Sequence, residues 1–330
     1  MNRTGRIFLA ALAGAAVLLF PVVTTTPYYI HTVLMVFLFA TMGLGWNLIG
    51  GYGAQLSLGH STFFAIGAYS AVLLMVNYEI SPLVGGIVGM VLACGAAVVI
   101  GLPCFRLRGP YFCLATIAAG EIARILFLHF QEFTGGANGV PLPFHGDDIL
   151  TLQFSSKAPY YYLALGLLVA VFVLVRWMEK AKIGRYLAAI REDQDAAESL
   201  GVRTDRVKLI AYVLSAAITA AAGVLYAFTV GYIDPDGVAS LNLSIEIAVV
   251  VIVGGIGTLW GPVLGATVVV LLTELTNMYL GSLRSGASLV LYGLLLIVVV
   301  VARPKGLISL FDRAPAASLP KQVGTRVHVA

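Results

Sequence analysis

A charged pair interrupts an otherwise apolar segment of the chain. Glu121 and Arg124 are three residues apart in LATIAAGEIAR (114–124), so on a helix they share one face and can neutralise each other. Opposite charges in this arrangement match the two ends of a zwitterion. They equally suit an internal ion pair that holds two helices in register. Ionisable residues inside an apolar helix are by default candidates for function.

A glycine-rich interruption near residue 50 precedes three polar side chains. It contains Gly51 and Gly53, and it is followed by Gln55, Ser57 and His60. In a membrane protein, glycine-interrupted helices expose backbone polar groups where they line a cavity, so they point to transport sites. The same glycines also allow tight turns and close packing of helices. For His60, a hydrogen-bonded role in helix packing is favoured over a proton relay.

The same glycine pattern returns late in the chain. It supplies Gly255 and Gly257, and both patterns are followed by an apolar segment, which hints at an internal duplication. Closely spaced glycines with Pro262 behind them are expected to break a helix. The predicted substrate pathway consists of Gly51, Gly53, Gln55, Ser57, His60, Glu121, Arg124, Gly255 and Gly257.

Several kinds of chemistry are disfavoured because their motifs are missing. There is no G-x-x-x-x-G-K-S/T phosphate loop, since GSLRSGAS (281–288) lacks the lysine that would reach phosphates. Metalloprotease and serine hydrolase motifs are absent as well. Cys94, Cys104 and Cys113 lack the spacing of a metal or redox site. We therefore expect no catalytic residue, metal or cofactor in this chain, and any ATP to be hydrolysed by a partner.

Composition shows that these residues lie on membrane helices. Hydrophobic residues make up 59% of the chain and charged residues only 11%, and the mean hydropathy is +0.94, whereas a soluble protein has about 25% charged residues. No charged residue occurs in the 72 positions from Ile7 to Tyr78, and one membrane helix needs about 20. Hydrophobicity is continuous rather than alternating, which favours helices over a barrel. The expected fold is an all-α polytopic membrane protein.

Breaker residues divide the apolar sequence into ten expected helices. An N-terminal signal peptide is disfavoured because no small-residue cleavage site follows the first apolar run. A count of eight follows if the first helix, or one glycine-rich pair, is re-entrant. Glu246 and Glu274 lie near expected helix ends, where an interfacial position explains them. The expected helices cover 7–23, 28–49, 54–76, 82–102, 111–130, 159–178, 208–231, 245–257, 260–275 and 286–302 of a transmembrane domain at 1–310, and a disordered tail follows at 311–330.

Basic segments alternate with acidic or neutral segments along the chain. Lys and Arg gather before residue 7, near residues 106–108, in 176–208 and after residue 302, and cytoplasmic loops are enriched in these residues. Both termini are then cytoplasmic, which requires an even number of spans and favours ten. Lipid head groups and insertion topology explain the net charge of +4, so it does not indicate nucleic-acid binding. The outer segment 131–159 contains GGANGVPLP, which predicts turns and a docking surface for a soluble partner.

One cytoplasmic segment, 179–208, is expected to fold in water. Between Arg176 and Lys208 lie 14 of the 36 charged residues of the chain. Within it, GRYLAAIREDQDAAESLG (184–201) predicts one short amphipathic helix that Gly201 ends. The side chains that share its apolar face are Leu187, Ile190, Ala197 and Leu200.

Part of this helix resembles a known motif. DAAESLG (195–201) is similar to the E-A-A-x-x-x-G motif of bacterial ATP-binding-cassette (ABC) import permeases, with Asp in place of Glu and without the I-x-L-P ending. In those proteins the helix fits a groove on the ATPase. The alternative is a helix that lies on the membrane surface. The resemblance implies that ATPase coupling is carried by Arg185, Ile190, Arg191, Glu192, Asp193, Asp195, Ala196, Ala197 and Gly201.

Five ordered signatures extend the resemblance over nearly the whole chain, excluding both ends. The chain resembles the branched-chain amino acid permeases, specifically the larger, M-type member of their two paired permeases. The resemblance implies a subunit in the bacterial inner membrane that works with a second homologous permease, two cytoplasmic ATP-binding subunits and a periplasmic protein that delivers Leu, Ile or Val. The signatures lie at 45–69, 114–124, 135–140, 184–193 and 254–266.

Two other functions share part of this pattern. A urea or short-amide permease would carry most of the same signatures. An ion-coupled secondary transporter would have similar hydrophobicity and broken helices, but it would not need a charged amphipathic helix shaped for an ATPase. The substrate is therefore less firmly indicated than the ABC permease class.

Overall fold

The computed structural model describes residues 14–24, 26–107, 109–144, 146–280, 293, 294, 297 and 306–310. Among these residues, seven helices are long and apolar enough to cross a membrane. The architecture is therefore that of an all-α polytopic membrane protein, as the composition predicts. The seven segments are Pro27–Tyr52, His60–Tyr78, Pro82–Cys104, Pro110–His129, Ala158–Lys180, Thr204–Val230 and Pro235–Gly254, and shorter apolar helices cover Gly14–Val23 and Gly261–Thr276.

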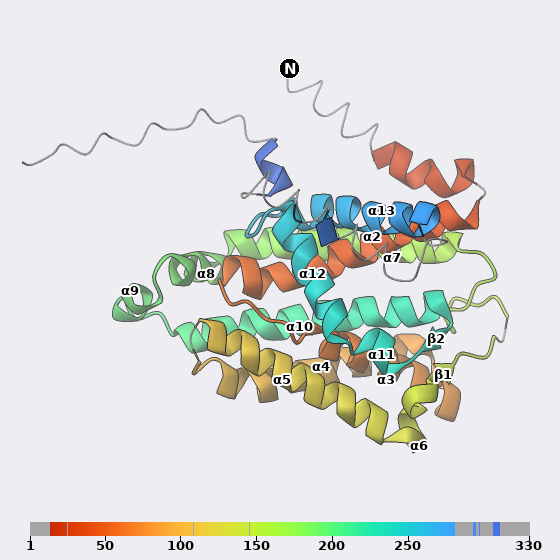
Figure 1. The fold of residues 1–330 in the computed structure, drawn as a ribbon, viewed down its shortest axis with the longest axis horizontal. Coiled ribbons are helices and arrows are strands. Elements are labelled where there is room, and N and C mark those ends of the chain that lie inside the picture. Colours follow the sequence, from red (N-terminus) through yellow and green to blue (C-terminus); the bar gives the residue numbers. More distant parts are fainter. Residues whose placement is uncertain are drawn as a thin grey trace, which may run out of the picture.

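The long helices form a bundle whose two ends carry different short elements (Figure 1). The bundle contains α2 (Pro27–Asn47) with its π-helical continuation η1 (Leu48–Tyr52), α3 (His60–Tyr78), α4 (Pro82–Cys104), α5 (Pro110–His129), α7 (Ala158–Lys180), α10 (Thr204–Val230), α12 (Leu241–Gly254) and α13 (Gly261–Leu280). One end, the α8 end, carries α8 (Lys182–Glu192) and α9 (Gln194–Ser199). The other, the α11 end, carries α6 (Gln131–Thr134), η2 (Gly136–Asn138), β1 (Val140–Pro141), β2 (Tyr232–Ile233) and α11 (Pro235–Val238). A short 3-10 helix, η3 (Leu307–Leu310), packs against α12 and α13.

The expected helices correspond to those of the bundle, with boundaries that differ by a few residues. Each of the first nine overlaps an observed helix, and the break predicted around 254–262 is confirmed, since α12 ends at Gly254 and α13 begins at Gly261. The third expected helix is wrong at its start, because residues 54–59 are not helical and α3 begins only at His60. Of the tenth expected helix, 286–302, only residues 293, 294 and 297 are described, as helical, and the tail 311–330 lies outside the described residues.

Helix α2 lies at the centre of the bundle. It contacts α7, α10, α12 and α13, and 83% of its most apolar window is buried within the protein. A helix that is apolar on all sides is stable only when neighbours surround it. By contrast, only 17% of the corresponding window of α5 is buried. The outer face of α5 is therefore available to lipid or to another membrane subunit.

Glycines allow α3 and α10 to approach each other closely. A methyl group added at Gly223 would collide with the carbonyl oxygen of Phe64, and one added at Gly67 would collide with the carbonyl oxygen of Ala220. Small residues at such a crossing let two backbones touch, which is a common way for membrane helices to pack. The α3–α10 contact therefore depends on these two glycines.

At the α11 end, a two-stranded sheet joins distant parts of the chain. Strand β1 pairs antiparallel with β2, with Val140 opposite Ile233 and Pro141 opposite Tyr232. The predicted turns in this segment are present, and Gly139 adopts a φ of +64°, a conformation that glycine tolerates best. The sheet fixes the segment after α5 to the segment after α10, so the loops at this end form one connected surface.

Candidate functional site

The predicted amphipathic helix at 184–201 is two helices in the structure. Asp193 has extended backbone geometry, and its carboxylate accepts a hydrogen bond of 3.0 Å from the Ala196 N–H. An aspartate in this position satisfies a free N–H at the start of a helix. The expectation of a single helix is therefore wrong, because Asp193 ends α8 and caps α9.

The break at Asp193 also changes which residues face the bundle. Leu187, Ile190 and Ala197 are buried as predicted, but Leu200 is 85% exposed. The prediction for Leu200 assumed one continuous helical face, which the extended backbone at Asp193 interrupts. The exposed side of the α8–α9 segment contains Arg185, Arg191, Glu192, Asp193, Asp195, Ala196 and Gly201.

Helix α9 is tied to the beginning of α10 by two polar contacts. The Glu198 carboxylate accepts a hydrogen bond of 2.6 Å from the Thr204 hydroxyl, and Lys208 Nζ donates one of 2.6 Å to the side-chain oxygen of Gln194. Between them, Gly201 has a φ of +85°, where a Cβ atom would be strained. Helix α9 is therefore fixed directly to the start of a membrane-spanning helix.

We expect Asp193→Ala to loosen α9. Loss of an N-cap side chain costs roughly 1 kcal/mol, which corresponds to about a fivefold rise in local opening. Hydrogen exchange of the amides at 196–199 would measure this rise. Asp193→Asn, which keeps an acceptor for the Ala196 N–H, is the matched control and should exchange like the native protein. Equal exchange rates for the Ala variant and the native protein would show that the cap does not hold α9.

Arg191 is the α8 residue that reaches the glycine breaks. A methyl group added at Gly257, whose φ is +71°, would collide with Arg191 Nη1. Asn47 of α2 forms two hydrogen bonds with the same loop. Its Oδ1 accepts a hydrogen bond of 2.9 Å from the Gly257 N–H, and its Nδ2 donates one of 2.9 Å to the Thr258 carbonyl. A methyl group added at Gly51 would collide with Asn47 Oδ1. The two glycine patterns therefore meet at one junction, with Arg191 beside them.

The end of α7 is bound to the same region. Tyr52, the last residue of η1, donates a hydrogen bond of 2.6 Å to Glu179, and Glu179 also pairs with Arg176 at 2.9 Å. π-helical turns such as η1 occur frequently at functional sites. This contact joins α2 to the segment that leads into α8.

Residues 54–59 return from the glycine break into the bundle without helical hydrogen bonds. Trp46 Nε1 donates a hydrogen bond of 2.7 Å to the Ser57 carbonyl, and the Leu58 N–H donates one of 3.1 Å to the Thr116 hydroxyl. Side chains of α2 and α5 thus satisfy backbone groups that a helix would have paired, as non-helical backbone inside a membrane protein requires. His60 is fully buried at the start of α3, where its Nε2 and the Ser215 hydroxyl are 2.8 Å apart. This contact links α3 to α10.

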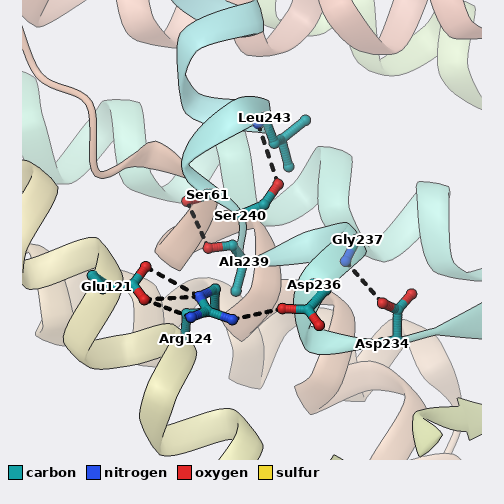
Figure 2. Close-up of polar contacts among 9 residues, drawn as sticks. All are labelled: Ser61, Glu121, Arg124, Asp234, Asp236, Gly237, Ala239, Ser240 and Leu243. Carbon is teal, nitrogen blue, oxygen red and sulfur yellow. Dashed lines mark hydrogen bonds and ion pairs between the residues drawn. The ribbon is translucent and has the colours of Figure 1, made fainter. Parts of the chain in front are cut away.

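Glu121 and Arg124 form the predicted pair, and a third residue extends it (Figure 2). Arg124 Nε lies 3.1 Å from both Glu121 oxygens, and its Nη1 lies 2.6 Å from Asp236 of α11. The side chains of Arg124, Glu121 and Asp236 are 26%, 45% and 65% exposed. Arg124 therefore connects α5 to α11 in a partly open position at the α11 end.

The predicted pathway residues do not form a single site. They are distributed along the length of the bundle. Gly51, Gly53, Gly255 and Gly257 lie at the junction beside Arg191 of α8. Gln55 and Ser57 follow between η1 and α3, and His60 begins α3. Glu121 and Arg124 lie in α5, where Arg124 contacts α11.

A family described as the branched-chain amino acid transport system permease component matches residues 28–300. The chain belongs to this family. The branched-chain amino acid permease LivM of Escherichia coli K12 is 31% identical over 336 residues, which covers 92% of this chain and 75% of LivM. The permease LivH of Salmonella typhimurium is 26% identical, covering 82% of this chain and 91% of LivH. A solved structure titled PsaBC from Streptococcus pneumoniae in complex with Fab matches at a TM-score of 0.47 and 13% identity, covering 90% of this chain and 100% of that chain.

The chain is thus a multi-pass membrane permease subunit of an ABC importer. Two residues important to the permease geometry are missing from the sequence predictions. Asn47 could have been found, because it is the one amide side chain in the apolar run 27–49 and polar residues in such runs need partners. Asp236 could not, since 112 positions separate it from Arg124 and no local spacing joins them.

Proposed function

We propose that this permease imports a branched-chain amino acid and that α8 and α9 receive the movement of its ATPase subunits. The coupling role is supported by one observation. The exposed α8–α9 segment contacts the junction of both glycine breaks, because Arg191 of α8 lies against Gly257. A surface helix that only rested on the membrane would not need this connection. The substrate class is supported by the relatives LivM and LivH, which are branched-chain amino acid transport permeases.

The proposed orientation places the α8 end in the cytoplasm of a bacterial cell, with the chain in the inner membrane. The segment from Arg176 to Lys208, which contains α8 and α9, has eight of the 20 basic residues, and cytoplasmic loops are enriched in such residues. Ten spans with both termini in the cytoplasm agree with this charge distribution. The sheet and α11 then face the periplasm.

The proposed partners are a second homologous permease, two cytoplasmic ATP-binding subunits and a periplasmic substrate-binding protein. Similarity of this chain to both LivM and LivH supports a pairing of related permeases. The absence of a phosphate loop from the sequence supports ATP hydrolysis by separate chains. The mostly exposed α5 offers membrane surface for the second permease or for lipid.

Movement of the ATPases would reach the membrane helices by two routes. Helix α9 is fixed to α10 through Glu198 and Gln194, while α8 lies against the glycine junction through Arg191. Packed helices move as rigid bodies and change between discrete arrangements. A push on α8 and α9 would therefore shift α10 relative to the junction of α2, α12 and α13, which is the kind of change that opens or closes a route.

The decisive experiment reverses charge on the exposed face of α8 and α9. We expect the double variant Glu192→Arg and Asp195→Arg to lose most of the ATPase from the purified complex. In the proposed interface these carboxylates pair with basic groups of the ATPase, and the arginines would instead face like charges, which costs several kcal/mol. Co-purification, ATP hydrolysis and leucine uptake in proteoliposomes would be measured together. Glu132→Arg, an equally exposed reversal in α6 at the opposite end, is the control and should retain the ATPase.

Two results would contradict the proposed function. Full retention of ATPase and uptake in the double variant would remove α8 and α9 from the coupling surface. Full uptake by this chain alone, in vesicles without any ATPase, would instead indicate an ion-coupled transporter. The substrate is tested separately by measuring whether the partner binding protein binds leucine, phenylalanine or urea.

A further inference from the structure

A cavity of about 470 Å³ lies between α2, α10, α12 and α13, toward the α11 end. Its volume falls within the range of about 300–1,000 Å³ that small-molecule sites occupy. Along α2 it extends from His31 to Met42, a rise of about 16 Å at the usual helical spacing. The cavity therefore reaches from the α11 end well into the bundle.

The lining of this cavity changes character along its length. Apolar side chains that include Leu38, Met42 and Phe64 form the deeper part, whereas His31, Asp236 and Glu274 lie nearer the α11 end. A ligand that fits this lining has an apolar body and a polar head. The arrangement matches the usual small-molecule site, which is mostly apolar with a few placed polar groups.

Glu246 is the acidic residue of the lining whose charge is not satisfied by its neighbours. Asp236 pairs with Arg124, and Glu274 accepts a hydrogen bond of 2.9 Å from Tyr28. Within the described part of the chain, no group donates a hydrogen bond or forms an ion pair with the half-buried carboxylate of Glu246. A carboxylate in such surroundings is costly unless a cation or donor joins it.

A second unsatisfied group lines the same cavity from α2. Among the described residues, Nδ1 of His31 is buried and has no hydrogen-bond partner. Buried polar atoms without partners are rare and ask for an explanation, such as a missing ligand or water. His31 on α2 and Glu246 on α12 therefore place polar groups without described partners on two helices that line the cavity.

Glu246 lies on the wall of the cavity. The sequence places it near a helix end, but it is the sixth residue of α12, and it lines the cavity together with residues of α2 and α13. At the rim, Asp236 holds the guanidinium of Arg124 at 2.6 Å, as Figure 2 shows. Arg124 is bound by Glu121 as well, so the charges at the rim are paired, whereas no described residue pairs with the carboxylate in the interior of the cavity.

We infer that this cavity binds an amino acid with an apolar side chain during transit, with Glu246 pairing with its α-ammonium group. The apolar side chain lies against the deeper wall formed by Leu38, Met42 and Phe64. This inference rests on the proposed function and adds a substrate-contacting residue to it.

The test uses the complete complex in proteoliposomes with leucine-loaded binding protein. Glu246→Gln keeps the size of the side chain but removes the charge, so leucine uptake should fall roughly tenfold or more, as expected for loss of a charged hydrogen bond. Stimulation of ATP hydrolysis by the loaded binding protein should persist, because neither α8 nor α9 is altered. Glu79→Gln, the same change on an exposed residue outside the cavity and outside the predicted docking segment, should transport normally. Uptake by Glu246→Gln at the native rate would overturn the inference.

A second measurement tests occupancy directly and does not depend on uptake. Thr273→Cys places a thiol on the cavity lining, in a background where Cys94, Cys104 and Cys113 are serine. Leucine should slow its reaction with a charged methanethiosulfonate, and Glu246→Gln should abolish that protection. Equal labelling with and without leucine would overturn the inference. Protection by phosphatidylethanolamine vesicles but not by leucine would overturn it too, assigning the cavity to a lipid head group.

The proposed function and the assignment of the cavity are contradicted by different results. If the unaltered complex hydrolysed ATP without regard to the loaded binding protein, the proposed function would fail. If stimulation persisted but Glu246→Gln transported leucine normally, only the cavity assignment would fail.

Discussion

Replacing Gly223 with valine is expected to prevent the bundle from assembling. The Cβ atom alone would collide with the carbonyl oxygen of Phe64, and a backbone oxygen inside a helix cannot move aside as a side chain can. Overpacking a well-packed interior costs about 1–3 kcal/mol, occasionally more. Here the cost falls on the crossing of α3 and α10, which also contains the contact between His60 and Ser215. We therefore expect little or no folded protein.

The yield of monodisperse protein after detergent extraction, together with thermal unfolding of what remains, measures this effect. Gly166→Val is the matched control, because Gly166 lies in α7 and a Cβ atom there would meet nothing within 4 Å. The control should fold as the native protein does. If Gly223→Val gave normal yield and thermal stability, the close approach of α3 to α10 would not be required for the fold.

The positions of the membrane helices could be predicted because the bilayer imposes them on the sequence. Backbone groups in lipid must be paired within a helix, so each span needs its own long apolar run. The start of α3 was predicted wrongly, at residue 54 instead of His60. Residues 54–59 lie within a long uncharged run, yet they are not helical, because side chains of Trp46 and Thr116 bind their backbone instead. Those partners lie on α2 and α5, and no local pattern reveals them.

The coupling segment shows the same division between local and tertiary information. Amphipathic spacing identified Leu187, Ile190 and Ala197 as buried, whereas Leu200 is exposed. The difference arises at Asp193, whose capping bond to Ala196 starts a second helix. The D-x-x-A spacing alone does not distinguish a cap from a charged residue in the middle of a continuous helix. Both are compatible with the same hydrophobic pattern.

The candidate site was predictable only where its members are close in sequence. The spacing of Glu121 and Arg124 predicts their contact, and the structure adds Asp236 from a distant element. Glu246 shows the limit more clearly, because its proximity to a helix end indicated an interfacial residue. The cavity that it lines exists only once four helices are packed. Pockets formed by distant helices leave no periodic signal in one sequence.

Arg191→Gln is expected to separate ATP hydrolysis from transport. The guanidinium lies against Gly257, beside the place where Asn47 joins the two glycine patterns, and glutamine is too short to fill that position. Coupling between two sites typically amounts to about 1–3 kcal/mol, so leucine uptake per ATP hydrolysed should fall roughly tenfold. The ATPase subunits should still co-purify, because the exposed acidic residues of α8 and α9 are unchanged.

Arg185→Gln separates this role from simple binding of the ATPase. Arg185 lies on the same helix, but its guanidinium bonds to the Lys180 carbonyl at 3.2 Å rather than to the glycine junction. Its loss should at most weaken ATPase binding, while the ratio of uptake to hydrolysis stays native. An unchanged ratio in Arg191→Gln as well would contradict a role of Arg191 in coupling.

Gly257→Ala disturbs the contact between Arg191 and Gly257 from the glycine side. Its added methyl group would displace Arg191, and the positive φ costs alanine about 1–2 kcal/mol. If the two residues act through one contact, the double variant should lower the ratio of uptake to hydrolysis no further than the stronger single variant. Residues that share an interaction depart from additivity, while independent sites add. Additive losses would mean that Arg191 and Gly257 act separately and that the coupling route passes through α9 and α10 instead.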